Sequence, residues 1–369
     1  YIAGSELNDD PFKPLSRSAH DLLAQHGDDT PIAWLHRSER YTEKLATPDV
    51  SVADLIGDVD PIKAATLKLP YSDERVIHYG LIPRANRGIF VINELPDLQA
   101  RIQVALFNIL QEGDIQIRGF KMRLPLDIQF IFTANPEDYT NRGSIVTPLK
   151  DRIESQIVTH YPREISLGRK ITEQEAKVKS GQESIIINDL SKDLIEQIAI
   201  EARNSEYVDS KSGVSARMTI TAYETLLSAV ELRMLLNNEQ NNHVRVTDLF
   251  EVIPAICGKV ELVYEGEIEG PVMVAYNLIA RAIRSQFLHY FPDPIKFKQQ
   301  SANPYFKIIN WFESGNQLDI FSDSSQAEYE EKLLSIHGLE ELVEQYTERV
   351  SYQEKLFLME FALHGMAEY

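Results

Sequence analysis

Two short apolar runs, each ending in polar residues, constrain what this chain can fold into more than any other feature. The first run, residues 89–92, stops at Asn93 and Glu94, and the second, residues 128–134, is followed by Asn135. Short runs rich in β-branched and aromatic residues are typical of buried parallel strands. Ligands of open α/β sheets bind outside the carboxyl ends of such strands. We therefore expect Glu94 and Asn135 to lie at one edge of a parallel sheet, in a hydrolytic site.

Four segments, taken in order, resemble the AAA+ ATPases of the magnesium-chelatase I-subunit and MoxR branch. They are residues 85–94 (Walker B), 132–136 (sensor 1), 149–152 (arginine finger) and 215–217 (sensor 2). The resemblance covers residues 45–265. It implies an α/β fold with a P-loop-type parallel sheet in residues 1–165, a helical lid in 166–265 and a C-terminal helical extension in 266–369.

The same resemblance implies a role for five side chains. Glu94 would activate the attacking water, Asn135 would position it, and Arg152 would reach the γ-phosphate of a neighbouring subunit. Arg217 would contact phosphate from the lid, and Asn93 would hold Mg²⁺ through a water molecule. Four of these residues have a structural alternative: a glutamate favoured at a helix start for Glu94, an Asn-Pro turn for Asn135, and a surface arginine paired with a neighbouring acid for Arg152 and Arg217.

Two departures from the family pattern concern nucleotide binding. Asn93 stands where most Walker B motifs have aspartate, and it lacks the charge that Mg²⁺ prefers. The sequence contains no G-x-x-x-x-G-K-[ST] phosphate loop. Because the chain begins at Tyr1, already inside the expected core, we expect the loop in residues that precede it. The alternative is a protein that has lost nucleotide binding.

The resemblance implies a mechanical function driven by ATP and Mg²⁺. A homo-oligomeric, hexameric ring in the cytoplasm would remodel a protein substrate, as a chaperone does, or assist metal insertion. A partner protein with a von Willebrand A domain is implied by the resemblance alone. Two alternatives remain: a non-catalytic AAA+-like scaffold or assembly subunit, and a DNA motor.

Composition bears on these alternatives. The formal net charge of −19 disfavours a nucleic-acid-binding surface, because phosphate contacts need lysine and arginine. The single cysteine, Cys257, excludes an internal disulfide and fits a reducing compartment. No apolar run approaches the length of a membrane span, and we expect no signal peptide.

The pattern after Glu94 predicts a helix followed by a hairpin. Apolar residues recur every three or four positions from Leu98 to Ile109, and Gly113 closes the helix. Two alternating runs around Gly119 then predict a hairpin that carries three basic residues: Arg118, Lys121 and Arg123. In the resembled family a hairpin here approaches the ring pore, and a solvated hairpin face is the equally weighted alternative.

The remainder of the chain is predicted to be helical. A helix beginning near Ser215 places Ile220, Tyr223, Leu227 and Val230 on one face, and Thr247 or Asp248 suits the first residue of another helix. Three further apolar stripes lie in residues 272–290, 339–346 and 352–363. We expect these stripes to be packed helices, with a partner-docking face as the alternative.

Overall fold

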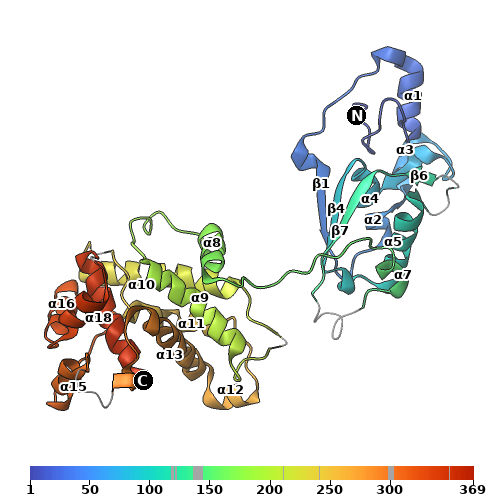
Figure 1. The fold of residues 1–369 in the computed structure, drawn as a ribbon. Coiled ribbons are helices and arrows are strands. Elements are labelled where there is room, and N and C mark those ends of the chain that lie inside the picture. Colours follow the sequence, from blue (N-terminus) through green and yellow to red (C-terminus); the bar gives the residue numbers. More distant parts are fainter. Residues whose placement is uncertain are drawn as a thin grey trace. The chain divides into compact units, whose positions relative to one another are not determined.

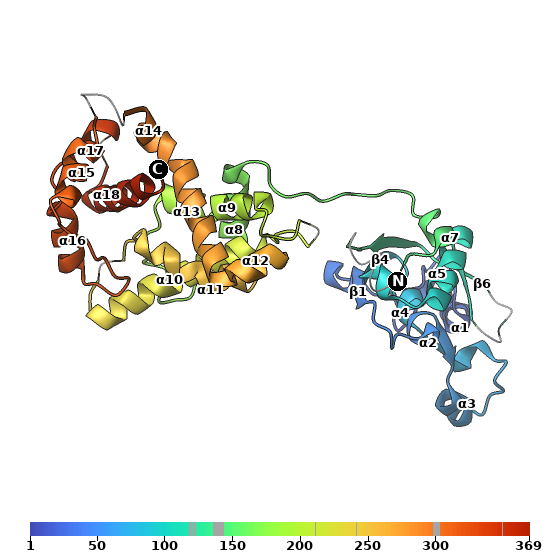
Figure 2. The same ribbon diagram turned by 90° about the horizontal axis from the view of Figure 1, so that it is seen from below.

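The computed structural model describes residues 1–117, 120, 123–135, 144–210, 212–240, 242–297, 303–348 and 350–369. Contacts divide the chain into two compact units, Tyr1–Val158 (unit 1) and Thr159–Tyr369 (unit 2). Unit 1 combines strands with helices, and unit 2 is built from helices (Figures 1 and 2). The boundaries that we expect between core, lid and extension stay predictions.

The elements of unit 1 are α1 (Arg17–His26), η1 (Gly27–Asp29), η2 (Arg37–Arg40), β1 (Tyr41–Leu45), α2 (Val52–Leu55), β2 (Gly57–Val59), α3 (Pro61–Leu67), η3 (Glu74–Val76), β3 (Ile77–Tyr79), α4 (Leu81–Arg84), β4 (Gly88–Asn93), η4 (Leu95–Asp97), α5 (Ala100–Glu112), β5 (Asp114–Gln116), β6 (Arg123–Pro125), β7 (Ile128–Phe132) and α7 (Thr147–Lys150).

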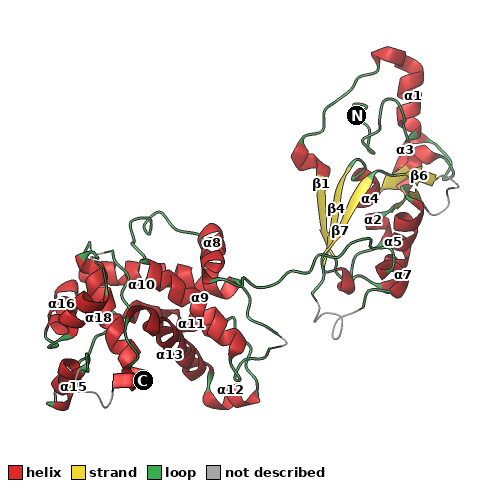
Figure 3. Cartoon of the chain, viewed as in Figure 1, coloured by secondary structure: helices red, strands yellow, loops and turns green. Residues whose placement is uncertain are grey.

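The sheet that carries the site has the order β1–β4–β7, with both strand pairs parallel (Figure 3). One face packs on the core of unit 1, where Phe90 and Ile92 are buried and the rings of Phe90 and Phe130 meet edge to face at 6.0 Å. The predicted parallel pairing of the two apolar runs is therefore confirmed. Strand β1 lies in the polar region before residue 45, where no strand is predicted from the sequence.

The opposite face of this sheet remains open within the described chain. Tyr41 and Leu45 on β1 are 50% and 53% exposed, and Ile89 and Ile131 on β4 and β7 are 38% and 44% exposed. Parallel sheets usually have both faces covered, because their strands are apolar on both sides. This sheet has the exposed apolar side chains expected where a covering layer is absent.

Helix α5 and the hairpin after it form as the sequence predicts. The buried residues of α5 include Ile102, Leu106 and Ile109, and Gly113 ends the helix with a φ of +69°. Strands β5 and β6 then pair in antiparallel fashion. The basic residues of the hairpin cannot be placed, since Arg118, Lys121 and the side chain of Arg123 lie outside the described residues.

The elements of unit 2 are α8 (Ile165–Glu175), α9 (Asp189–Asn204), α10 (Arg217–Asn237), η5 (Thr247–Val252), α11 (Ile253–Cys257), α12 (Tyr264–Glu269), α13 (Pro271–Tyr290), α14 (Pro294–Phe297), α15 (Phe306–Glu313), α16 (Gln326–Leu334), α17 (Leu339–Tyr346) and α18 (Tyr352–Ala367). The three predicted C-terminal stripes correspond to α13, α17 and α18. A single buried cluster, from Leu190 to Ala362, joins residues of the predicted lid and extension. Among the described residues, no helix has the length and apolar character needed to cross a bilayer.

Helix α10 begins at Arg217, close to the predicted start near Ser215; Leu227 and Val230 on it are buried, and Ile220 and Tyr223 are partly buried. One detail of the predicted lid is wrong. The segment at Thr247 begins as the 3-10 helix η5, whose cap residue Val246 makes no side-chain capping bond. The backbone N–H groups of Val246 and Thr247 donate instead to the carboxylate of Glu360 on α18, more than a hundred residues along the chain.

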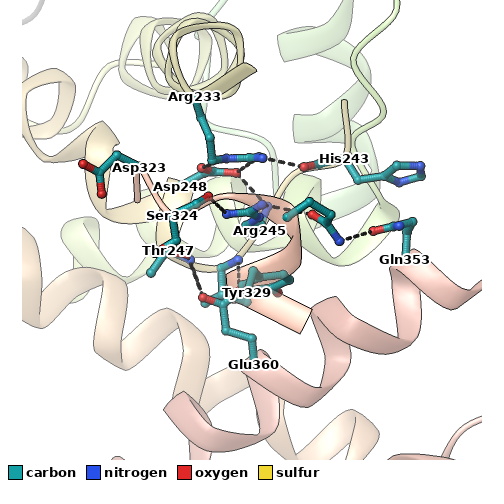
Figure 4. A network of polar contacts seen from close by, with 12 residues as sticks. Arg233, His243, Arg245, Thr247, Asp248, Asp323, Ser324, Tyr329, Gln353 and Glu360 are labelled. Atoms are coloured by element: carbon teal, nitrogen blue, oxygen red, sulfur yellow. Dashed lines mark hydrogen bonds and ion pairs between the residues drawn. The ribbon is translucent and has the colours of Figure 1, made fainter. Parts of the chain in front are cut away.

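Asp248 belongs to a buried ionic network (Figure 4). Its carboxylate accepts two hydrogen bonds from Arg233 of α10, at 3.2 and 2.9 Å, and both side chains are almost fully buried. Burial raises the pKa of Asp248, and the ion pair with Arg233 opposes that rise. The network extends through Arg245 and Tyr329 to Glu360, so it ties α10 and η5 to α16 and α18.

Candidate functional site

The carboxyl ends of β4 and β7 meet at one edge of the sheet. Ile92 lies opposite Phe132 in the strand register, and the backbone N–H of Thr133 donates to the carbonyl of Ile92 at 3.0 Å. The N–H of Leu95 donates in turn to the carbonyl of Thr133 at 2.9 Å. These two bonds hold Glu94, which lies between the bonded positions, beside the end of β7.

Glu94 has an unusual backbone conformation. Its φ of 57° and ψ of 48° are left-handed, a region that costs a non-glycine residue about 1–2 kcal/mol. Its N–H donates to Oγ1 of Thr133 at 3.2 Å, and its side chain makes no capping bond to η4, which follows it. No side-chain capping bond therefore supports the alternative that Glu94 is there because glutamate is favoured at a helix start. Strained residues of this kind cluster at functional sites, where the surrounding structure imposes the conformation.

Asn93 is engaged on both sides of its amide. Its Nδ2 donates to the carboxylate of Glu43 on β1, and its Oδ1 accepts a hydrogen bond from Oγ1 of Thr133 at 3.2 Å. The hydroxyl of Tyr41 donates to the other oxygen of Glu43 at 2.9 Å, and this bond raises the pKa of Tyr41. Two polar residues that sequence reasoning missed, Glu43 and Thr133, thus adjoin Asn93.

The only sequence signal for Glu43 is weak. Tyr41, Glu43 and Leu45 alternate with Thr42 and Lys44, which is the two-residue period of a strand. The pattern mixes polar and apolar residues on the same face, so it does not stand out from the polar region around it.

The described residues do not by themselves fit Mg²⁺. No group of three or more His, Cys, Asp or Glu residues lies close enough to hold a metal in the described part of the chain. The oxygen of Asn93, expected to hold Mg²⁺ through water, already accepts a hydrogen bond from Thr133. The structure therefore gives the metal no complete ligand set here.

Asn135 lies two residues beyond Thr133 and is exposed. The proline that follows it falls in residues 136–143, outside the described residues, so the Asn-Pro turn alternative cannot be compared with the structure. Its role in positioning water stays a prediction.

Arg152 follows α7 and has two partners within its own chain. Its guanidinium pairs with the carboxylate of Asp151 and lies 5.4 Å from the ring centroid of Phe107 on α5. This pair with Asp151 is the structural alternative for Arg152. Because the Asp151 side chain is 72% exposed, the pair contributes little, about 0–1 kcal/mol, and a stronger anion could displace it. The action of Arg152 on a neighbouring subunit stays a prediction.

Arg217 is the exposed first residue of α10, in unit 2. Its N–H donates to Oγ of Ser215 at 3.1 Å. A cation in the first turn opposes the helix dipole, so this position does not favour arginine for helix stability. Contact with phosphate, the role that the resemblance implies for Arg217, is untested by this geometry.

Comparisons with known proteins agree with the AAA+ resemblance. Residues 70–157 match the Sigma-54 interaction domain, an AAA+ domain. The magnesium-chelatase 38 kDa subunit of Cereibacter sphaeroides is 27% identical over 140 residues, which cover 36% of this chain and 39% of that protein. The hydrogenase transcriptional regulatory protein HoxA of Cupriavidus necator is 32% identical over 108 residues, covering 27% of this chain and 22% of that protein.

Among solved structures, the complex between subunits BchI and BchD of magnesium chelatase shows 18% identity and a TM-score of 0.29. The match covers 62% of this chain and 72% of that chain. With respect to the curated relatives, the chain spans 39% of the length of the chelatase subunit and 22% of that of HoxA. The matched residues 70–157 include the segments that resemble Walker B, sensor 1 and the arginine finger, so this part of the chain is similar to AAA+ domains, and the chain is also similar to a magnesium-chelatase subunit over 140 residues.

Proposed function

We propose that this protein is a subunit of a ring, hexameric by family resemblance, that hydrolyses ATP in the cytoplasm to remodel a protein partner or to assist metal insertion. The observation that carries the proposal is the meeting of β4 and β7, which presents Glu94 in a left-handed conformation beside Thr133. Relatives of AAA+ type support ATP hydrolysis in general.

Each proposed role follows from the chemistry of the side chain. The carboxylate of Glu94 would orient and deprotonate the attacking water, and the amide of Asn135 would hydrogen-bond that water or the γ-phosphate. Arg152, once released from Asp151, would stabilise the charge that develops on the phosphate of a neighbouring subunit. Arg217 would report the nucleotide state to unit 2.

The phosphate loop would come from polypeptide that precedes Tyr1. The open face of the sheet supports this part of the proposal, because Tyr41, Leu45, Ile89 and Ile131 remain exposed where a parallel sheet usually has helices. Strand β7 has no partner on its other side within the described residues, so a further parallel strand could pair there. Such a strand and the helix after it would bring the phosphates and Mg²⁺ to the edge that carries Glu94.

A partner subunit is part of the same proposal. The complex of BchI and BchD joins two different subunits of magnesium chelatase. By analogy, this chain would act with a second protein, for which one carrying a von Willebrand A domain is the candidate. The net charge of −19 makes DNA the less favoured partner, which the salt dependence of DNA affinity would test.

A non-catalytic scaffold is the second candidate function. The observation that favours it is Asn93, an amide in the usual place of a carboxylate, with both of its polar groups bonded within the chain. A scaffold would bind its partner without nucleotide turnover.

Replacement of Glu94 by glutamine in polypeptide that carries a phosphate loop separates the two candidates. Glu94→Gln should still bind ATP and assemble but hydrolyse it about 10²–10⁴-fold more slowly, because the amide keeps the shape and loses the base. Glu112→Gln, at the exposed end of α5, is the matched control and should leave turnover unchanged. Equal turnover by Glu94→Gln and wild type would remove Glu94 from the mechanism, and no turnover by wild type would favour the scaffold.

A further inference from the structure

A continuous chain of hydrogen bonds crosses the three strands at the proposed site. The Tyr41 hydroxyl donates to Glu43 at 2.9 Å, and the amide nitrogen of Asn93 donates to the same carboxylate. The hydroxyl of Thr133 then donates to the amide oxygen of Asn93 at 3.2 Å, and the backbone N–H of Glu94 donates to the hydroxyl of Thr133 at 3.2 Å. The chain thus begins on β1 and ends at the left-handed residue that we propose as the base.

We infer that Glu43 and Asn93 act as one unit, which we call the Glu43–Asn93 pair. Glu43 on β1 carries the negative charge at this edge of the sheet, and the neutral amide of Asn93 on β4 is its partner. Beside the carboxylate of Glu43, the central place in this chain needs a side chain that both donates and accepts, and an amide does so. It donates through Nδ2 and accepts through Oδ1 at the same time, whereas an ionised carboxylate only accepts. Aspartate at position 93 would bring two carboxylates into contact, and like charges at such a distance destabilise each other.

The strand register explains why these two residues meet. Glu43 lies opposite Val91, and Leu45 lies opposite Asn93, so Glu43 and Asn93 are diagonal neighbours that point to the same face of the sheet. Diagonal neighbours in a sheet are within reach of long side chains. Glutamate is long enough to make this contact, and the hydroxyl of Tyr41 holds its second oxygen.

The role that we assign to Glu43 is that of a positioning residue, and it rests on the proposed function of Glu94. Glu43 orients the amide of Asn93, the amide orients the hydroxyl of Thr133, and that hydroxyl holds the N–H of Glu94. The opposing view is that the exposed Glu43 and the partly exposed Asn93 are surface polar side chains whose contact has no measurable energy. The two views differ in whether changes at positions 43 and 93 are coupled.

Hydrogen exchange at the Glu94 amide measures this coupling in the 369-residue chain without nucleotide. Asn93→Asp should lower the protection of this amide about tenfold, after correction for intrinsic exchange, because a net hydrogen-bond contribution of about 0.5–1.5 kcal/mol corresponds to up to about tenfold. In the double variant Glu43→Gln/Asn93→Asp, the side chain at position 43 donates the hydrogen bond to the side chain at position 93, and the net charge is unchanged. The protection of the Glu94 amide should then return to within about threefold of wild type.

A matched double variant excludes a general effect of charge. Glu112→Gln/Asn93→Asp removes a carboxylate elsewhere in unit 1 and should be as poorly protected as Asn93→Asp alone. The inference is wrong if Asn93→Asp keeps wild-type protection, or if Glu43→Gln rescues it no better than Glu112→Gln does.

Kinetics in polypeptide that carries a phosphate loop then test the link to catalysis. Asn93→Asp should lower kcat and leave KM for ATP within about twofold, and the Glu43→Gln/Asn93→Asp variant should restore kcat. If protection at Glu94 is rescued and kcat is not, the positioning role of Glu43 is wrong. If protection is rescued and no variant, wild type included, hydrolyses ATP, the Glu43–Asn93 pair stands and the proposed function fails.

Discussion

Removal of Glu360 should destabilise unit 2 more than any surface change. This side chain on α18 is 1% exposed and accepts four hydrogen bonds: from the backbone N–H groups of Val246 and Thr247 at 2.6 and 2.9 Å, from the Thr247 hydroxyl at 2.8 Å and from the Tyr329 hydroxyl at 2.9 Å. It also offsets the buried charge of Arg245. A buried donor without an acceptor costs about 1–3 kcal/mol, and loss of one partner from a buried charged network costs about 3–5 kcal/mol.

We therefore expect Glu360→Ala to lower the free energy of unfolding of unit 2 by about 3–5 kcal/mol. Urea unfolding followed by the fluorescence of Trp311 measures this, since Trp311 packs partly buried against the core of unit 2 and the only other tryptophan, Trp34, is already 91% exposed. Glu331→Ala, at an exposed position of α16, is the control and should stay within about 0.5 kcal/mol. A loss below about 1 kcal/mol for Glu360→Ala, at unchanged m-value, would refute the role of Glu360 in joining η5 to α18.

Two further changes test separate parts of the fold. Burial alone would raise the pKa of Asp9, but hydrogen bonds from Ser5 and Ser16 and from backbone N–H groups outweigh it and lower the pKa below 3.8. A carboxylate whose pKa is lower in the folded state stabilises the protein above its unfolded pKa, and this stabilisation is lost as the pH falls through the folded pKa. In a thermal-unfolding series, wild type should therefore lose stability below about pH 4. Asp9→Asn should show a smaller loss over the same pH range. Gly365→Ala should lower the Tm of unit 2, because the new Cβ would lie 2.0 Å from the Phe287 ring. Overpacking of this kind costs about 1–3 kcal/mol. An unchanged Tm would mean that α13 and α18 separate easily.

Local patterns predicted much of the site-bearing sheet. Strands β4 and β7 contain the short apolar runs 89–92 and 130–132, which are typical of parallel strands, and such runs stand out in a sequence. Helix α5 repeats its apolar residues at helical spacing and ends at Gly113, whose positive φ suits glycine. These signals lie within each segment, so they do not depend on the rest of the fold.

Strand β1 could not be found in this way. Its residues Tyr41 and Leu45 are about half exposed, and Glu43 shares their face, so the strand has no apolar side of its own. It is a strand because it pairs with β4, which is a contact between residues about fifty positions apart. The partner of Asn93 was missed for the same reason: the sequence shows the lost charge at position 93 but not the carboxylate that β1 brings beside it.

Long-range pairing also explains the error at Thr247 and Asp248. Both residue types favour helix starts, and that local rule predicted a capping role. In the structure Asp248 instead pairs with Arg233 in the core, and Glu360 accepts the hydrogen bonds from the start of η5. A residue that sits 113 positions away takes the place of the local cap, which no pattern near Thr247 indicates.

Subunit mixing tests the central claim, that ATP is hydrolysed between subunits by Glu94 of one and Arg152 of the next. In polypeptide that carries a phosphate loop, Arg152→Ala should bind ATP nearly normally and hydrolyse it poorly, since arginine fingers contribute about 10³–10⁵-fold in GTPases. Glu94→Gln has the opposite defect, because its own site is inactive and its Arg152 is intact. Mixed rings should regain part of the wild-type turnover at interfaces that pair a working Glu94 with a working Arg152. If rings that demonstrably exchange subunits stay as inactive as either parent, Arg152 acts only through Asp151 in its own chain and the account is contradicted.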